Sequence, residues 1–245
     1  MNVLILGAAG GIGSQLVSDL AELHNLLLGY NQNMPVAQSA KLEPVDACSF
    51  ESVQSFVQTG LDEFGSVDSI VNLSGNLILK PAHLSTEEEF YQSIDINLKS
   101  AFAVVRAAGS LLRDCSVVLM STAAVRVGLA NHELISCAKS GVEGLARSAA
   151  KTYAKKNIRV NTVAPGLVDT PLSSKIVNNQ MALNVSKKMH AVGEIGKPKD
   201  ISNMISFLID PENNWITGQK FVVDGGLSST TVSYTHLTLP TNREV

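Results

Sequence analysis

Cysteine is scarce in this chain of 245 residues, which contains only Cys48, Cys115 and Cys137. Their wide and unequal spacing matches neither a metal-binding motif nor a disulfide framework. We therefore expect no metal site and three free thiols, the usual state of cysteine in the reducing cytoplasm.

Long apolar runs and a basic N-terminal segment are also missing. No run reaches the roughly 18 apolar residues that a membrane-spanning helix needs. Residues 1–7 carry no positive side chain and enter a glycine-rich turn at once, which favours a strand over a signal peptide. The expectation is a soluble, cytoplasmic protein with no membrane partner.

Positive charge is low and scattered along the chain. The 19 lysines and arginines stand against 22 acidic residues, a net charge of −3, so no basic surface for nucleic acid is expected. Apolar side chains make up 45% of the residues, which is enough for a substantial core. No proline- or serine-rich linker, internal repeat or low-complexity segment divides the chain.

Short apolar runs alternate with segments of helical periodicity, which is the pattern of a parallel sheet with crossover helices. The runs lack strict polar–apolar alternation, as strands buried on both faces should. We predict a single-domain α/β fold: a doubly wound (Rossmann) parallel seven-stranded sheet with helices on both faces. Strands are predicted at residues 3–6, 26–28, 42–45, 69–73, 116–120, 159–164 and 220–223.

Two of the intervening segments show one apolar helix face each. The first face consists of Leu16, Val17, Leu20 and Leu23, and the second of Phe50, Val53, Phe56, Val57, Leu61 and Phe64.

A glycine-rich turn joins the first predicted strand to the first helix. Gly7, Gly11 and Gly13 allow a sharp bend and close backbone approach to a pyrophosphate, while the helix N-terminus offers free N–H groups. A purely structural tight turn is the alternative reading of this motif on its own. The strand before it and the amphipathic helix after it favour dinucleotide binding.

The end of the second strand, at Tyr30 and Asn31, is where such folds distinguish the ribose of the dinucleotide. An acidic residue there binds the ribose hydroxyls, and an arginine pairs with a 2′-phosphate. This chain offers neither, because no lysine or arginine occurs from Met1 to Ala40. The expected cofactor is NAD or NADP, with no preference between them.

Further motifs follow in order along residues 1–227, and together they resemble the short-chain dehydrogenase/reductase family. They are residues 7–13 (TGxxxGxG, with Leu6 in place of threonine), Asp46 (the adenine-contacting aspartate), residues 72–75 (NNAG), Asn97 (the helix-borne asparagine), Lys139 (the lysine of YxxxK), residues 165–170 (PGxxxT, which contacts the nicotinamide carboxamide), and Gly218 with residues 224–226 (the closing pattern).

The resemblance implies a set of cofactor-binding residues. They are Gly7, Gly11, Ile12, Gly13, Tyr30, Asn31, Asp46, Asn72, Gly75, Lys139, Pro165, Gly166, Val168 and Thr170. The interval between Asn31 and Val45 is shorter than the family's, so an abbreviated helix is expected there.

The family's proton-transferring tyrosine is missing, because its position is occupied by Ile135. In the family a lysine four residues later stabilises the phenolate, and it also binds the nicotinamide ribose. The catalytic serine normally lies thirteen residues before the tyrosine, which falls on Thr122 here. The resemblance therefore implies a catalytic set of Asn97, Thr122 and Lys139. Loss of general acid–base help typically slows a reaction 10²–10⁴-fold.

His132 is a candidate replacement for the phenol, because histidine titrates near neutrality. With Asn131 as helix N-cap, His132 would lie in the first turn on the side of Lys139. Each catalytic candidate has a plainer alternative: a solvated His132, an exposed Lys139, and an Asn97 or Thr122 bonded only to nearby backbone. His24, His83 and His190 are expected at the surface.

Two functions remain open at this point. One is an oxidoreductase that reduces a carbonyl or oxidises an alcohol with NAD or NADP; the other is a dinucleotide-binding sensor, regulator or partner subunit with little turnover. The variable segment 167–193 should cover the pocket as a lid. Its apolar residues, Leu172, Ile176, Met181, Leu183 and Met189, suggest a partly apolar small-molecule substrate, or else serve packing.

By analogy with the family, a homodimer or homotetramer is expected through the helices that contain Asn97 and Lys139. Small residues there would permit close helix approach: Ala101, Ala103, Ala107, Ala108, Ala146, Ala149 and Ala150. The dinucleotide-binding domain is assigned to residues 1–231. Ten residues from Val232 resemble a translated sequencing adapter, so 232–245 are interpreted as a non-native tail.

Overall fold

The computed structural model describes residues 1–37 and 40–230. The interpretation of 232–245 as a non-native tail therefore lies outside the described residues. Within them, no helix is long and apolar enough to cross a membrane.

A single parallel sheet of seven strands forms the centre of the molecule, in the order β3-β2-β1-β4-β5-β6-β7. The strands are β1 (Asn2–Leu6), β2 (Asn25–Tyr30), β3 (Lys41–Pro44), β4 (Ser69–Asn72), β5 (Ser116–Met120), β6 (Arg159–Pro165) and β7 (Lys220–Val223). Every neighbouring pair is parallel. The predicted sheet is confirmed, and each predicted strand overlaps an observed one.

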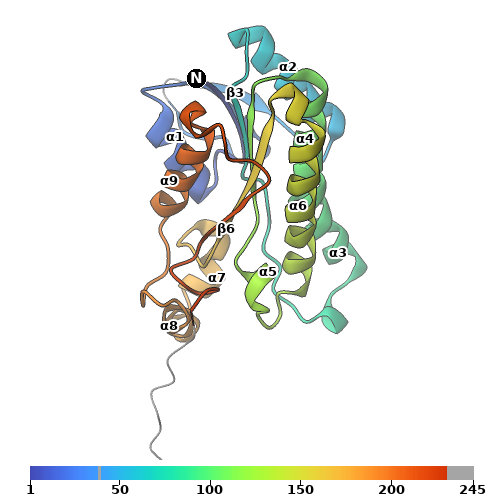
Figure 1. Ribbon diagram of the computed structural model, residues 1–245. Helices are drawn as coiled ribbons and strands as arrows, with labels where there is room; N and C mark the ends of the chain where they lie inside the picture. Colours follow the sequence, from blue (N-terminus) through green and yellow to red (C-terminus); the bar gives the residue numbers. More distant parts are fainter. Residues whose placement is uncertain (38–39, 231–245) are drawn as a thin grey trace, which may run out of the picture.

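Helices cover both faces of this sheet (Figure 1). The helices of the described chain are α1 (Gly11–Leu20), α2 (Phe50–Phe64), α3 (Glu87–Ile94), α4 (Ser100–Leu111), α5 (Ala124–Val127), α6 (Glu133–Thr152), α7 (Ser174–Val177), α8 (Gln180–Met189) and α9 (Pro198–Ile209). One face carries α1 and α9, and the other carries α2, α4 and α6. The direction of winding changes between β1 and β4, where doubly wound sheets place their ligands.

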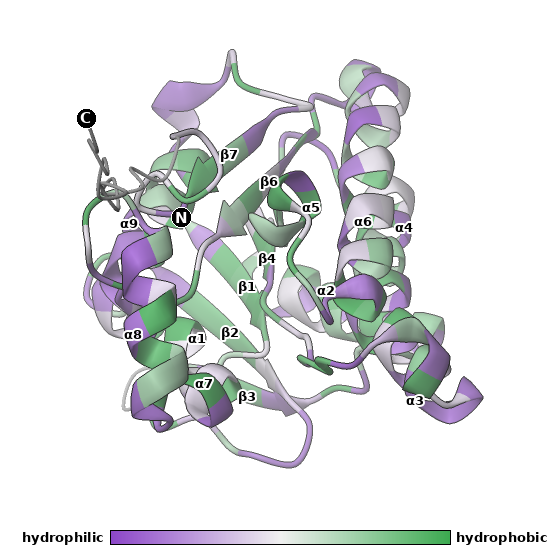
Figure 2. Cartoon of the chain, turned by 90° about the horizontal axis from the view of Figure 1, so that it is seen from below, coloured by the Kyte–Doolittle hydropathy of each residue, from purple (hydrophilic) through white to green (hydrophobic). Residues whose placement is uncertain are grey.

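Two hydrophobic clusters, one on each face, hold these layers together. The strands alternate their apolar side chains between them: Leu4 and Leu6 of β1 belong to the cluster beneath α2, α4 and α6, while Val3 and Ile5 belong to that of α1 and α9. Figure 2 shows the strands largely in the hydrophobic colour. Burial on both faces explains why the strands read as continuous apolar runs in the sequence.

Three details of the predicted elements were wrong. No helix links β2 to β3 within residues 31–37 and 40, where a shortened one was expected. Leu23 lies beyond the end of α1 and is 76% exposed. Phe50, at the first position of α2, is also exposed, because the apolar face of that helix begins one turn later, at Val53.

The alanines expected to allow close approach between subunits are instead buried within this chain. All seven belong to the cluster between the sheet and helices α2, α4 and α6: Ala101, Ala103, Ala107, Ala108, Ala146, Ala149 and Ala150. Small side chains let α4 and α6 lie close to the strands and to each other. They therefore carry no information about an oligomer interface.

Candidate active site

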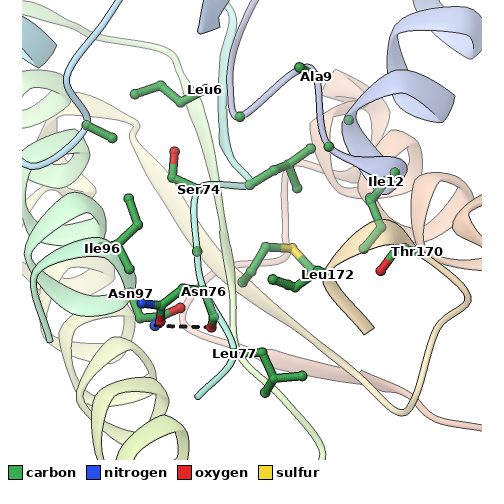
Figure 3. A pocket seen from close by; sticks show the side chains of 18 of the residues that line it. Leu6, Ala9, Ile12, Ser74, Asn76, Leu77, Ile96, Asn97, Thr170 and Leu172 are labelled. Carbon is green, nitrogen blue, oxygen red and sulfur yellow. Dashed lines mark hydrogen bonds between the residues drawn. The ribbon is translucent and has the colours of Figure 1, made fainter. Parts of the chain in front are cut away.

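A cleft of about 1110 Å³ opens along the carboxyl ends of strands β1 to β6. Its walls come from the segments that follow β1, β2, β3, β4, β5 and β6, and from the first half of α6. Figure 3 shows Asn76 and Asn97 on one side of the cleft, with Ile12 and Thr170 on the other. The site therefore lies where a doubly wound fold binds its ligand.

The glycine-rich turn lines one end of the cleft, and its geometry excludes side chains. Gly7 has a φ of +75°, and a Cβ there would lie 2.8 Å from the carbonyl carbon of Leu73. A Cβ at Gly13 would lie 2.5 Å from the Gly7 carbonyl oxygen. The turn is thus closed tightly enough to aim the N-terminus of α1 into the cleft, where the first N–H groups of a helix lack partners.

The same turn packs against the segment that follows β6. A Cβ at Gly11 would lie 2.9 Å from two side-chain carbons of Thr170. Gly11, Ile12 and Thr170 all line the cleft, so the two predicted cofactor-binding motifs meet across it. A backbone cradle of this kind accepts the diphosphate of a dinucleotide in a position that Cβ atoms would otherwise fill.

The far end of the cleft, beyond β2 and β3, is lined by uncharged amides and one carboxylate. Tyr30 and Asn31 line it as predicted, together with Gln32 and Asn33. Asp46 is exposed and accepts a hydrogen bond from the Cys48 backbone N–H at 2.9 Å. Cys48 also lines the cleft, which the sequence did not predict, and burial raises the pKa of its thiol.

Asn72 supports the wall of the cleft and does not line it. Its Nδ2 donates to Ser100 Oγ at 3.1 Å, and its Oδ1 accepts from the Ser74 backbone N–H at 3.1 Å. The side chain is 3% exposed. Of the predicted cofactor-binding residues, Asn72 alone is absent from the cleft lining, and it links the segment after β4 to α4.

Asn97 lies in a π-helical turn, Asp95–Lys99, inserted between α3 and α4. Single π turns of this kind are frequent at functional sites. The Asn97 Nδ2 donates to Asn76 Oδ1 at 2.7 Å and to the Ser93 carbonyl oxygen at 3.0 Å. Its Oδ1 is buried and accepts no hydrogen bond from the residues that the structure describes. Asn76 was missed by the sequence reasoning, which ended its motif at Gly75.

Gly75 lies between Asn97 and Lys139. A Cβ on Gly75 would be 2.8 Å from Asn97 Oδ1 and 3.7 Å from Lys139 Nζ. Asn97 Oδ1 and Lys139 Nζ therefore both lie next to Gly75, in the segment after β4. Glycine is required at this position, because any side chain would displace the Asn97 amide.

Lys139 is buried in the wall of the cleft, one helical turn after Ile135 on α6. It is 6% exposed, and burial lowers the pKa of its ammonium to about 8. No ion pair or hydrogen bond engages Nζ within the described residues. Ile135 is 4% exposed and also lines the cleft, so an apolar side chain stands beside this amine.

The segment after β5 places Thr122 in the cleft beside a buried polar cluster. Thr122 Oγ1 accepts the Ala124 N–H at 3.3 Å, which leaves the hydroxyl hydrogen available to a ligand. Next to it, Ser121 Oγ donates to Glu143 Oε1 at 2.7 Å, and Lys220 Nζ lies 3.1 Å from Glu143 Oε2. This cluster, which the sequence did not predict, ties β5, α6 and β7 together.

The structure does not bring His132 into the cleft lining. It is the N-cap of α6, without a side-chain capping bond, and its Nδ1 lies 2.8 Å from the Ala130 carbonyl oxygen. The prediction of Asn131 as N-cap was wrong, because Asn131 has a φ of +64° and precedes the cap. Helix α6 starts one residue later than expected, so His132 lies at the end of the preceding loop and not in the first helical turn.

The segment 167–196 follows β6, and its last residue lies next to its beginning. Val168 forms an isolated parallel bridge with Gly196. His190, at the end of α8, is 4% exposed, with Nδ1 2.7 Å from the Ser186 carbonyl oxygen and Nε2 accepting the Leu167 N–H at 3.3 Å. The prediction of His190 at the surface was wrong, because this histidine fastens α8 to the β6 end.

Most residues predicted to contact a ligand do line the cleft. They are Gly7, Gly11, Ile12, Gly13, Tyr30, Asn31, Asp46, Gly75, Asn97, Thr122, Lys139, Pro165, Gly166, Val168 and Thr170. Of the apolar residues assigned to the lid, Leu172 lines the cleft, whereas Met181 is 79% exposed on α8. No group of His, Cys, Asp and Glu side chains in the described part of the chain is arranged to hold a metal ion.

Comparisons with known proteins identify the family of this chain. The family model described as enoyl-(acyl carrier protein) reductase matches residues 7–228. A tropinone reductase homologue from Arabidopsis thaliana, described as chloroplastic, is 31% identical over 245 aligned residues, covering 93% of this chain and 76% of that protein. The 3-oxoacyl-[acyl-carrier-protein] reductase of Vibrio cholerae is 29% identical, with 91% and 96% covered.

Solved structures show the same architecture. The ligand-free aldohexose dehydrogenase of Thermoplasma acidophilum superimposes with a TM-score of 0.88 at 26% identity, covering 96% of this chain and 97% of that one. A short-chain dehydrogenase/reductase from Serratia marcescens, 23% identical with a TM-score of 0.84, shares the fold over 93% of this chain and 97% of its own. The chain belongs to the short-chain dehydrogenase/reductase family of oxidoreductases.

Proposed function

We propose that this protein binds NAD or NADP and transfers hydride between the nicotinamide and a small carbonyl or alcohol substrate. One observation carries the proposal: a single cleft is lined by both the glycine-rich turn at the start of α1 and the buried amine of Lys139. If the glycine-rich turn had only a structural role, a buried amine such as that of Lys139 would not be needed in the same cleft. A cofactor with its diphosphate at one end and its reactive ring at the other matches this distribution.

Different residues of the cleft would bind different parts of the cofactor. Gly11, Ile12 and Gly13 would hold the diphosphate through the helix N-terminus. Tyr30, Asn31 and Asp46 would contact the adenosine half, and neutral amides there provide no basis for preferring NAD or NADP. Pro165, Gly166, Val168 and Thr170 would hold the nicotinamide, and Lys139 its ribose. When bound, the cofactor supplies or accepts the hydride.

The reactive end of the cleft lacks the phenol that the family uses, because Ile135 occupies its position on α6. Thr122 retains a hydroxyl whose hydrogen is free to point at a substrate oxygen. Asn97 holds the segment after β4 in place through Asn76. The lining also includes Leu77, Met120 and Leu172, which suits a substrate with an apolar portion next to its carbonyl.

Coenzyme binding is the first test of this function. Isothermal titration with NADH and NADPH at millimolar concentration should detect association with at least one of them. Gly13→Ala should abolish it, because the new Cβ would collide with the Gly7 carbonyl oxygen. Gly144→Ala is the matched control, since a Cβ there meets nothing within 4 Å. Absence of binding to either coenzyme in the unmodified protein would overturn the proposal.

Turnover separates the oxidoreductase from a protein that only binds the dinucleotide. Nicotinamide absorbance should change when a panel of ketones, aldehydes and secondary alcohols is offered to the coenzyme complex. Binding without any such change would instead favour a sensor, a regulator or the partner of an active subunit. His132→Ala should leave the rate unaltered, because His132 lies outside the cleft lining.

We propose a homodimer or homotetramer as the working assembly. The support is family membership and the exposed aromatic side chains on the outer surfaces of α2 and α4. Phe50 and Phe102 are stacked there with their ring centroids 5.8 Å apart, although each is more than a third exposed. Light scattering of the purified protein tests the assembly, and a monomer at all concentrations would contradict it.

A further inference from the structure

Reduction of a carbonyl needs a proton on oxygen as well as a hydride on carbon, so the cleft must contain a proton donor. Within the described residues, the titratable groups that line the cleft are Tyr30, Asp46, Cys48, Asp95 and Lys139. The first three lie beyond β2 and β3, at the opposite end from the segments after β5 and β6. Asp95 is half exposed and lies 3.7 Å from Lys99.

Lys139 is thus the titratable group on the same side as Thr122, Pro165 and Gly166. The electrostatic surroundings of its amine are unusual. Glu143, one turn further along α6, is engaged by Ser121 and Lys220 and does not neutralise Lys139. The adjoining segments after β4 and β5 contribute Gly75, Asn76 and Thr122, which carry no charge. On the lid side, residues 170–173 of the lining contain no ionisable group.

Burial without a counter-ion destabilises the charged form of an amine. The pKa of Lys139 is accordingly lowered to about 8, whereas an ordinary lysine titrates near 10.4. Both the ammonium and the amine are then populated close to neutral pH. A donor of this acidity releases its proton far more readily than a surface lysine does.

One more feature orients the amine. Among the described residues, no donor reaches the buried Asn97 Oδ1, and this oxygen adjoins the same point of Gly75 as Lys139 Nζ. Lys139 is the one cationic side chain among the described residues that line the cleft. Asn97 is therefore suited to hold Lys139 on the cleft side of α6, directly or through one water molecule.

We propose that Lys139 itself gives the proton to the substrate oxygen, in place of the phenol that Ile135 has removed. This inference rests on the proposed function. As the carbonyl carbon accepts hydride from the reduced nicotinamide, the C=O π electrons move to oxygen, and an N–H bond of the Lys139 ammonium breaks as the new O–H bond forms. Lys139 is left as a neutral amine and regains a proton from solvent through the open cleft.

The first experiment measures the acidity of Lys139 without coenzyme or turnover. Competitive labelling of the amines with a small acylating reagent, followed by mass spectrometry across pH 6–11, gives the titration of each lysine. Residue 139 should titrate one to three pH units below Lys99, which serves as the internal reference. A titration of Lys139 together with the surface lysines would overturn the inference.

The second experiment measures kcat for carbonyl reduction at saturating coenzyme as a function of pH. The rate should fall about tenfold per pH unit above roughly 8, as the ammonium is lost. Lys139→Arg keeps a cation for coenzyme binding but cannot release a proton, so kcat should drop 10²–10⁴-fold. Lys99→Met, on the neighbouring π turn and outside the cleft lining, should retain the wild-type rate and profile.

Ile135→Tyr provides the complementary measurement. A phenol one turn before Lys139 should take over proton transfer, raise kcat and change the basic limb of the pH profile. A rate that stays flat from pH 7 to 10, or a Lys139→Arg enzyme as fast as wild type, would overturn the inference and leave the oxidoreductase function intact. Coenzyme binding without turnover would overturn both the role of Lys139 and the oxidoreductase function. Absence of coenzyme binding would overturn the proposed function as a whole.

Discussion

Burial of the Lys139 ammonium destabilises the folded state, and the neighbouring residues do not offset this cost. The folded-state pKa of Lys139, about 8, is below the ordinary lysine value of 10.5, so the unfolded chain binds more protons between these two values. Stability therefore rises as pH increases through this window, and the destabilisation is fully present below pH 8. A shift of this size corresponds to roughly 3 kcal/mol at most. Groups kept at such a cost are typical of functional sites.

Lys139→Met should accordingly stabilise the protein while it disables the site. At pH 7 the free energy of unfolding should rise by about 1–3 kcal/mol, because an uncompensated buried charge is removed with little change of volume. The gain should shrink as the pH approaches 10.5, where lysine is neutral in both states. Urea denaturation at pH 7 and pH 10 measures this, and equal stabilities at pH 7 would contradict it.

At the scale of single residues, the sequence indicated which residues lie at the cleft better than it indicated what their side chains contact. Gly13 and Lys139 were recognised from their spacing, and both line the cleft. Asn72 was recognised as well, but its amide is consumed by Ser74 and Ser100. Whether a polar side chain points into a cleft or braces its wall depends on partners distant in the chain, which spacing does not reveal.

At the scale of elements, the pairing of α1 with α9 holds the glycine-rich turn in position. Asp19 on α1 contacts Lys199 and Ser202 on α9, and Gln15 one turn earlier on its own helix. Burial alone would raise the pKa of Asp19, but hydrogen bonds from Lys199, Ser202 and Gln15 outweigh it and lower the pKa below 3.8. The contribution to stability is present above this ordinary value and is lost as the pH falls through the lower, folded-state value.

Asp19→Asn should weaken this pairing. The free energy of unfolding at pH 7 should decrease by about 1–2 kcal/mol, because charge-assisted hydrogen bonds between the helices are lost. The difference from wild type should shrink as the pH falls below 3.8 and the wild-type carboxylate becomes protonated in the folded protein too. Asp62→Asn is the control, since Asp62 is exposed and bonded within α2 only to Gln58; equal effects of the two changes would refute the role of Asp19.

At the scale of the whole molecule, the seven-stranded sheet and the two hydrophobic clusters are formed by residues within 1–37 and 40–230, the part of the chain that the structure describes. The family model likewise ends at residue 228. The cleft is built from segments between Leu6 and Ser173. On this basis we keep the prediction that the folding unit ends near residue 231, which a truncation can test.

Removal of residues 231–245 should therefore leave the protein folded and able to bind coenzyme. The midpoint of thermal unfolding and the coenzyme Kd of the truncated chain should equal those of the full chain within error. Differential scanning calorimetry and coenzyme titration on both proteins provide the measurements. A large loss of stability on truncation would show that the segment belongs to the native fold.

The sequence alone determined the fold class, because apolar runs separated by helical periodicity allow few arrangements other than a doubly wound sheet. It also predicted a phosphate-binding role for the glycine-rich turn and the replacement of the family's tyrosine by Ile135, since both follow from local spacing, and both stay predictions.

Only the tertiary structure decided which side chains share an environment. It moved His132 out of the cleft lining, buried His190 against Leu167, and paired Glu143 with Ser121, which follows β5, and with Lys220 of β7. It also left Lys139 without an ion pair to any residue in 1–37 or 40–230. Desolvation and ion pairing depend on groups brought together from distant parts of the chain, so the acidity of that amine could not be read from sequence.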